Sequence, residues 1–141
     1  MTKKVEYGLI ALAYIGGHRN RPVSAREVAE QNAIPLSITA NVLKLLAKGR
    51  VLATRRGAAG GYTLGRELDD IRLQDVLSAV EGPVYLTPCC RGSGAASCDL
   101  EGSCAIQPSI SRLNAMLLES IAGMSLRDFL ALGRVPARSH A

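Results

Sequence analysis

The sequence contains no tryptophan, a single phenylalanine and only two histidines among its 141 residues. Its interior therefore has to be aliphatic, and apolar residues make up 48% of the chain, which is enough for one compact domain. No apolar run approaches the roughly 18 consecutive residues of a membrane span, and no signal-peptide pattern opens the chain. These absences predict a cytoplasmic protein that does not contact a membrane.

Catalytic patterns are also missing. The sequence has no Ser/His/Asp constellation, no glycine-rich phosphate loop and no paired carboxylates of the kind that common enzyme classes use. Its two histidines, His18 and His140, lack the spacing of zinc ligands. We therefore expect that this protein is not an enzyme.

Acidic residues are absent from one long stretch of the chain. Residues 31–66 contain no Asp or Glu but six Lys or Arg, and residues 1–66 carry a net charge of +8 against −3 for residues 67–141. A basic block inside a foldable segment is typical of a surface that binds a phosphate backbone, although a solvated basic face has the same composition. From charge alone both interpretations stay open, and double-stranded DNA becomes the expected partner only with the motifs that follow.

The basic block overlaps two predicted short helices. Ser24 and Glu27 form a capping-box pattern, and Pro35 suits the first turn of a second helix over residues 36–48. Two short helices joined by a brief turn have the geometry of a helix-turn-helix, whose second helix lies in the major groove. An ordinary solvent-exposed face is the alternative. The small, polar and cationic face of this helix consists of Ser37, Asn41, Lys44 and Lys48.

Residues 51–64 predict a β-hairpin, because two strand-like runs flank the glycine-rich turn at residues 57–61. A basic hairpin directly after a helix-turn-helix is typical of a wing. Arg55 and Arg56 are placed to enter a minor groove or to bind phosphates.

Further helices are predicted over residues 5–16, 71–80, 109–122 and 125–132. The helix over residues 109–122 has more apolar surface than packing on one small domain needs, so we expect it to pair with a second copy; packing on its own domain is the alternative. The predicted fold is mostly α with a small β-wing. It divides into a winged helix-turn-helix DNA-binding domain (1–82), a cysteine-rich loop (83–108), a dimerisation helix with a terminal helix (109–132) and a flexible tail (133–141).

All four cysteines, Cys89, Cys90, Cys98 and Cys104, lie in a segment rich in glycine and serine. Such a segment cannot build a core of its own. Cytoplasmic thiols are usually reduced, so clustered cysteines indicate metal ligands or redox sensors. Thiolates bind iron–sulfur clusters, and a glycine-rich backbone can donate N–H bonds to the cluster sulfurs. A metal-free thiol–disulfide switch is the alternative.

The order of these motifs resembles the Rrf family of winged-helix regulators, whose members include IscR, NsrR and RirA. The resemblance covers about residues 3–132. It is carried by VEYGLIAL at the start, the helix-turn-helix SAREVAEQNAIPLSITANVLKLLAKGRVL, the wing RRGAAGGYTL, the helix IRLQDVLSAVEGP and the spaced cysteines. It implies a homodimeric repressor that binds a roughly palindromic promoter operator, with Tyr62 of the wing motif among the DNA-binding residues.

The resemblance further implies an iron–sulfur cluster in each subunit, 4Fe–4S in preference to 2Fe–2S, that senses iron, nitric oxide or redox state. Cys90, Cys98 and Cys104 match the three family ligands, with seven and then five residues between them, a spacing closer to RirA-like than to IscR-like members. The histidine that IscR-like members use as a fourth ligand is Gln107 here. Glu6 of the first helix and Cys89 are candidates for that position, although Glu6 also suits a solvent-exposed or capping role.

Overall fold

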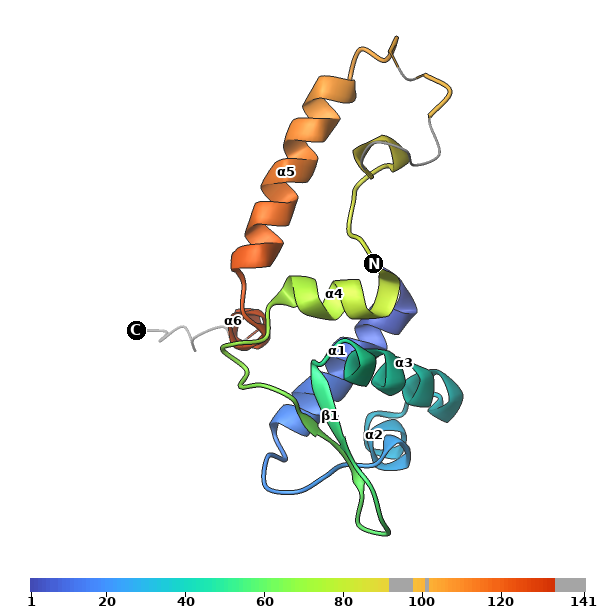
Figure 1. Cartoon of the computed structure of the whole chain (residues 1–141), viewed down its shortest axis with the longest axis vertical. Coiled ribbons are helices and arrows are strands. Elements are labelled where there is room, and N and C mark those ends of the chain that lie inside the picture. Colours follow the sequence, from blue (N-terminus) through green and yellow to red (C-terminus); the bar gives the residue numbers. More distant parts are fainter. Residues whose placement is uncertain (92–97, 101, 134–141) are drawn as a thin grey trace, which may run out of the picture.

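A computed structural model describes residues 1–91, 98–100 and 102–133. Within these ranges the structure contains helices α1 (Lys3–Gly16), α2 (Ala25–Asn32), α3 (Leu36–Lys48), α4 (Leu73–Glu81), α5 (Gln107–Gly123) and α6 (Leu126–Leu132), strands β1 (Leu52–Arg55) and β2 (Gly61–Leu64), and a short 3-10 helix, η1 (Pro88–Cys90) (Figure 1). The prediction of a mostly α fold with a small β-wing is confirmed. The predicted tail lies outside the described residues from residue 134 onward. No described helix is long and apolar enough to cross a membrane.

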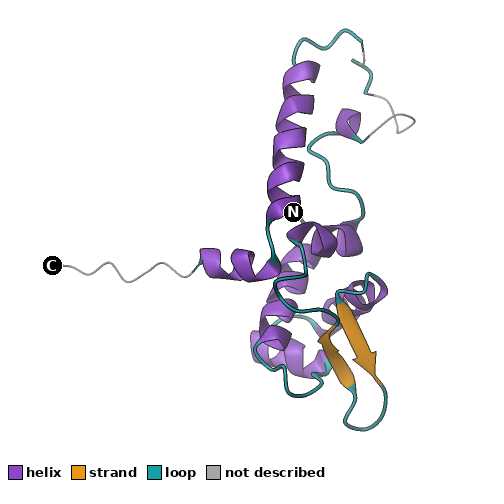
Figure 2. Cartoon of the chain, turned by 60° about the vertical axis from the view of Figure 1, so that its left-hand side comes forward, coloured by secondary structure: helices purple, strands orange, loops and turns teal. Residues whose placement is uncertain are grey.

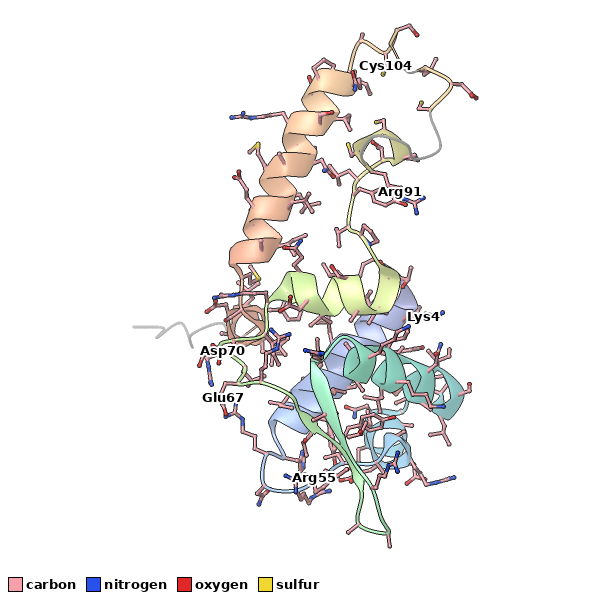
Figure 3. All side chains as sticks on the ribbon, viewed as in Figure 1. Lys4, Arg55, Glu67, Asp70, Arg91 and Cys104 are labelled. Atoms are coloured by element: carbon pink, nitrogen blue, oxygen red, sulfur yellow. The ribbon has the colours of Figure 1, made fainter. Side chains whose placement is uncertain are left out.

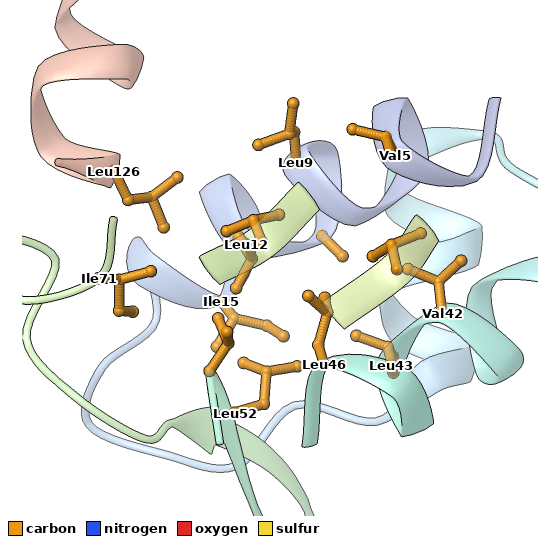
Figure 4. Close-up of a cluster of buried hydrophobic side chains, with 14 of the residues drawn as sticks. Val5, Leu9, Leu12, Ile15, Val42, Leu43, Leu46, Leu52, Ile71 and Leu126 are labelled. Carbon is orange, nitrogen blue, oxygen red and sulfur yellow. The ribbon is translucent and has the colours of Figure 1, made fainter. Parts of the chain in front are cut away.

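The core is aliphatic and forms around α1, which packs against α2, α3 and α4 (Figure 4). Leu12 and Ile15 of α1 meet Leu43 and Leu46 of α3, and each of these side chains is at most 1% exposed. Full burial of one such side chain stabilises the fold by about 1.5–3 kcal/mol. These contacts fix α3 to the domain by one face and leave its other face outside.

At the start of α2, one of the two hydrogen bonds of the predicted capping box is replaced by others. The Glu27 amide donates to Ser24 Oγ at 3.1 Å, as expected, but the Glu27 carboxylate does not return to the Ser24 amide. It accepts instead from the Tyr14 hydroxyl at 2.9 Å and from both terminal nitrogens of Arg21. A charge-assisted bond to a guanidinium is stronger than one to a neutral amide, which explains the exchange of partners.

The wing is an antiparallel hairpin that pairs Leu52 with Leu64 and Arg55 with Gly61. A third segment holds it in place, because Val23, which precedes α2, exchanges two backbone hydrogen bonds with Tyr62 of β2 at 2.9 and 2.8 Å. The wing is therefore fixed to the start of the helix-turn-helix as well as to the strand that follows α3.

Gly61 is the point where the wing approaches that segment most closely, and its φ is +156°. A Cβ at this position would lie 2.5 Å from the carbonyl oxygen of Val23. We expect Gly61→Ala to lower the free energy of unfolding by about 1–3 kcal/mol in urea denaturation. Gly123→Ala is the matched control, because its new Cβ meets no atom within 4 Å. Equal stability of the two variants would show that the close approach does not constrain the wing.

Helix α5 extends away from the part of the chain formed by α1 to α4 and the wing in both views (Figures 1 and 2). Two backbone hydrogen bonds fix the segment that follows the C-terminal end of α5. The Leu73 amide donates to the Met124 carbonyl at 2.9 Å, and the Leu126 amide donates to the Ile71 carbonyl at 2.7 Å. α6 returns Leu126 to the core. The predicted start at residue 109 is wrong: the helix begins at Gln107, because Pro108 fits the first turn, where its missing N–H has no helical partner to lose.

Candidate DNA-binding surface and thiol pocket

The predicted DNA-binding face of α3 is exposed over its whole length. Ser37, Asn41, Lys44 and Lys48 all lie on the solvent side. Thr39 lies on the opposite, buried side, where its hydroxyl donates to the Pro35 carbonyl at 2.7 Å. The geometry therefore matches a recognition helix packed on its domain by the apolar face.

The wing contributes two more exposed cations, Arg55 and Arg56. Tyr62 differs from them, because it is half-buried and packs against the core. Its backbone also carries the bridge to Val23. The structure thus places Tyr62 where it supports the wing and places the two arginines where they can meet a partner.

Ion pairs divide the cations of the domain into two groups. Arg19, Arg21 and Arg66 each pair with a carboxylate, from Glu67, Glu27 and Asp75 respectively. The hydrogen bond from Arg21 lowers the pKa of Glu27 from 4.5 to about 2, so this pair stays ionised at neutral pH. The predicted DNA-binding cations are Lys44, Lys48, Arg55 and Arg56. None of them makes an ion pair with a described carboxylate, so their positive charge stays available to phosphates.

Three of the four cysteines line one cavity of about 570 Å³, which we call the thiol pocket: Cys89 of η1, and Cys98 and Cys104 of the loop before α5. Apolar side chains form much of the remaining wall, among them Leu100 and Ile110. Gln107, at the position of the IscR-like histidine, lines the same cavity. The thiol pocket lies beyond the end of α5, and Figure 3 shows Cys104 and Arg55 at opposite ends of the molecule.

Cys90 is turned differently from its neighbour. The Thr87 hydroxyl lies 3.0 Å from Cys89 Sγ and 3.4 Å from Cys90 Sγ, and the Cys90 thiol donates to the Ile110 carbonyl at 3.9 Å. The structure thus places Cys89 in the wall of the thiol pocket with Cys98 and Cys104. Cys90 lies next to the pocket, because its sulfur is 3.4 Å from the hydroxyl of Thr87, which lines it.

The thiol pocket fits an iron–sulfur cluster by its donor set. All four cysteines are free thiols. Among the described residues, no group of three Cys, His, Asp or Glu is arranged to hold a single metal ion. In an iron–sulfur cluster each cysteine binds a different iron atom, so the thiols surround the cluster and do not have to meet at a single ion. Glu6 lies on α1 and pairs with Lys3 at 2.7 Å, and no described hydrogen bond or ion pair joins it to a cysteine.

A buried amide connects the cysteine-rich segment to α5. The Leu86 amide donates to Asn114 Oδ1 at 2.9 Å. Asn114 is 7% exposed and is the one buried side chain of α5, whose residues are all described. Because an unpartnered buried amide costs free energy, this bond holds the chain that leads to η1 against the helix.

Comparisons with known proteins agree with this geometry. A family model described as Rrf2, iron-dependent transcriptional regulator, matches residues 1–132. The chain is 28% identical to an rrf2-like HTH-type transcriptional regulator of Rhodobacter capsulatus, over 98% of this chain and 97% of the relative. It is 29% identical to IscR of Vibrio atlanticus, over 91% and 75%. The structure of CymR, the global cysteine regulator of B. subtilis, superposes with a TM-score of 0.74 at 22% identity, covering 94% and 96%, and so shares the fold.

Proposed function

Because the chain belongs to the Rrf2 family of transcriptional regulators, we propose that it is a homodimeric repressor whose affinity for promoter DNA is set by an iron–sulfur cluster. Family membership makes it a DNA-binding regulator and not an enzyme. The cluster, the repressor role and the dimer are the proposal. The observation that carries it is the placement of three thiols on one cavity at the end of a helix that leads back to the DNA-binding domain.

In this proposal α3 enters a major groove. Ser37 and Asn41 meet base edges, while Lys44 and Lys48 contact phosphates. Arg55 and Arg56 of the wing reach the adjacent minor groove or its phosphates. The absence of acidic residues from positions 31–66 supports this footprint.

The second copy pairs through α5. Leu113 and Met116 on this helix are 52% and 55% exposed, whereas Ile121 packs against the core. Large apolar side chains left in solvent on one side of a long helix favour a partner of the same kind. A dimer places two recognition helices on the two halves of a palindromic operator.

Cys90, Cys98 and Cys104 are the proposed cluster ligands, and Cys89 or Glu6 completes the set. A 4Fe–4S cluster, one in each subunit, would supply an iron open to nitric oxide and oxygen and sensitive to iron supply. The thiol sulfurs would hold the cluster, and apolar side chains such as Leu100 and Ile110 line the cavity beside them. The protein acts in the cytoplasm, where promoter DNA lies.

In this proposal the cluster acts on DNA binding through the residues that lie between the thiol pocket and the DNA-binding surface. The cysteine-rich segment follows α4 directly, and Asn114 fixes it to α5. Holding the cysteines in one arrangement therefore sets the position of α5 relative to α4. In a dimer joined through α5, that position decides the spacing of the two recognition helices, and with it the operator affinity.

Substitution of the unpaired cations tests the DNA-binding surface. Lys44→Ala and Arg55→Ala are each expected to weaken binding to the promoter of the protein's own gene, and to reduce the slope of log affinity against log salt by about 1. Fluorescence anisotropy at several salt concentrations measures both quantities. Arg112→Ala, which removes an exposed cation of α5, is the control. Unchanged affinity and salt slope in both test variants would mean that the DNA lies elsewhere.

A metal-free thiol switch is a second candidate, because Cys89, Cys98 and Cys104 share a cavity as free thiols. In this version an oxidant converts two of these thiols to a disulfide, and the cysteine-rich segment changes its position relative to α5. Mass spectrometry of the reduced and oxidised protein separates the two. A disulfide that changes operator affinity, in a protein that takes up no iron or sulfide, would replace the cluster in this account.

A further inference from the structure

A second cavity lies between the end of α1 and the wing and has a volume of about 430 Å³. Three arginines from separate parts of the chain line it: Arg19 in the turn after α1, Arg55 in β1 and Arg66 after β2. We call it the arginine pocket. Figure 3 shows two of its lining residues, Arg55 and Glu67, on the same flank of the domain. The proposed DNA-binding surface uses Arg55 alone and leaves the other two arginines without a role.

The charge of the arginine pocket is positive. Glu67 is its one lining carboxylate, and Arg19 donates to it at 2.8 Å. The Arg66 guanidinium donates to Asp75 Oδ2 at 3.1 Å and to the Asp70 carbonyl at 3.2 Å. Arg55 makes no ion pair with a described carboxylate. Three arginines and one carboxylate thus line the cavity, and of the three arginines Arg55 alone makes no described ion pair.

We propose that the arginine pocket binds a phosphate group. A guanidinium presents a planar pair of donors that matches two phosphate oxygens, and three arginines from separate segments line this cavity. Thr63 also lines the cavity, and its hydroxyl can serve as a neutral donor to the same anion. The phosphate comes either from a DNA backbone that passes the wing or from a free phosphorylated small molecule, since both present the same chemistry.

Glu67 is an internal competitor in this site. Its carboxylate occupies Arg19, and a phosphate that uses Arg19 has to displace it. Both partners are well exposed, with 42% and 68% of their side-chain surfaces accessible, so the pair is weak and exchangeable. Removing the charge of Glu67 is therefore expected to strengthen phosphate binding, whereas removing the charge of Arg19 weakens it.

The test is a titration of the full-length protein with inorganic phosphate at constant ionic strength, followed by amide NMR shifts. Saturable shifts are expected at Thr63 and Gly65, with binding about threefold tighter in Glu67→Gln and about threefold weaker in Arg19→Gln. Glu119→Gln and Arg112→Gln make the same charge changes at exposed positions of α5 and are the controls. Shifts that stay linear with concentration, or that respond equally to test and control variants, would overturn the proposal.

A second arm identifies the source of the phosphate. If inorganic phosphate weakens duplex binding by the wild type but not by Arg19→Gln, the site holds a DNA backbone phosphate. If phosphate binds the pocket and leaves duplex affinity unchanged, the site serves a free phosphorylated molecule. The titration needs neither DNA nor a cluster, so the site stands even if the proposed repressor function fails.

Discussion

Leu113→Glu is expected to convert the dimer into a monomer and to weaken operator binding by about 100-fold or more. Leu113 is 52% exposed in the isolated chain, so the substitution removes nothing that the chain's own fold buries deeply. In a dimer paired through α5 it would place two carboxylates in an apolar contact, and burying unpaired charges is costly. Losing the partner also removes the second recognition helix and the gain from binding two half-sites at once.

Ala115→Glu is the matched control for this experiment, because it adds the same charge to an exposed position on the other side of α5. Glutamate is a good helix former, so neither substitution should unwind the helix. Light scattering coupled to size-exclusion chromatography gives the mass, and anisotropy gives the affinity. A Leu113→Glu protein that remains dimeric and binds DNA like the control would rule out pairing through this face.

Cys98→Ser is expected to abolish cluster uptake, so that anaerobic reconstitution yields almost no bound iron or sulfide. Cys98 lines the thiol pocket and is the most exposed of the four cysteines, because the other three are half-buried. A serine hydroxyl stays protonated where a cysteine is a thiolate, and it is therefore a poor ligand for iron. Iron and sulfide counts per chain, together with the visible absorption spectrum, measure the result.

Ser103→Ala is the control for general disturbance of the loop, since Ser103 is an exposed neighbour of Cys104 whose hydroxyl donates to the Leu100 carbonyl at 3.2 Å. It should take up as much iron as the wild type. Comparing Cys89→Ser with Cys90→Ser then decides which member of the adjacent pair is the ligand. Normal iron content in Cys98→Ser would show that the metal binds outside the thiol pocket.

The helix-turn-helix and the wing could be predicted because their determinants are local. Ser24 caps α2, the polar face of α3 repeats with the helical period, and a glycine-rich turn separates β1 from β2. The exposed side of α3 followed from the same periodicity, as the burial of Thr39 illustrates.

Features that depend on tertiary contacts could not be predicted. The bond from Arg21 to Glu27 requires the turn after α1 to fold over α2, and no sequence spacing encodes that approach. The different surroundings of Cys89, which lines the thiol pocket, and Cys90, whose thiol donates to the Ile110 carbonyl, depend on how η1 docks on α5. The arginine pocket joins residues from three separate segments, so it became visible only once the wing was placed beside the end of α1.

The most direct test of the central claim is the operator affinity of anaerobically reconstituted protein, measured before and after cluster removal by nitric oxide, oxygen or a chelator. The account predicts that the protein binds iron and sulfide, and that removal changes the affinity by about tenfold or more, in the range of typical allosteric coupling. The Cys98→Ser protein should show no change under the same treatment. A colourless wild type without iron or sulfide, or one affinity for both states, would contradict the account.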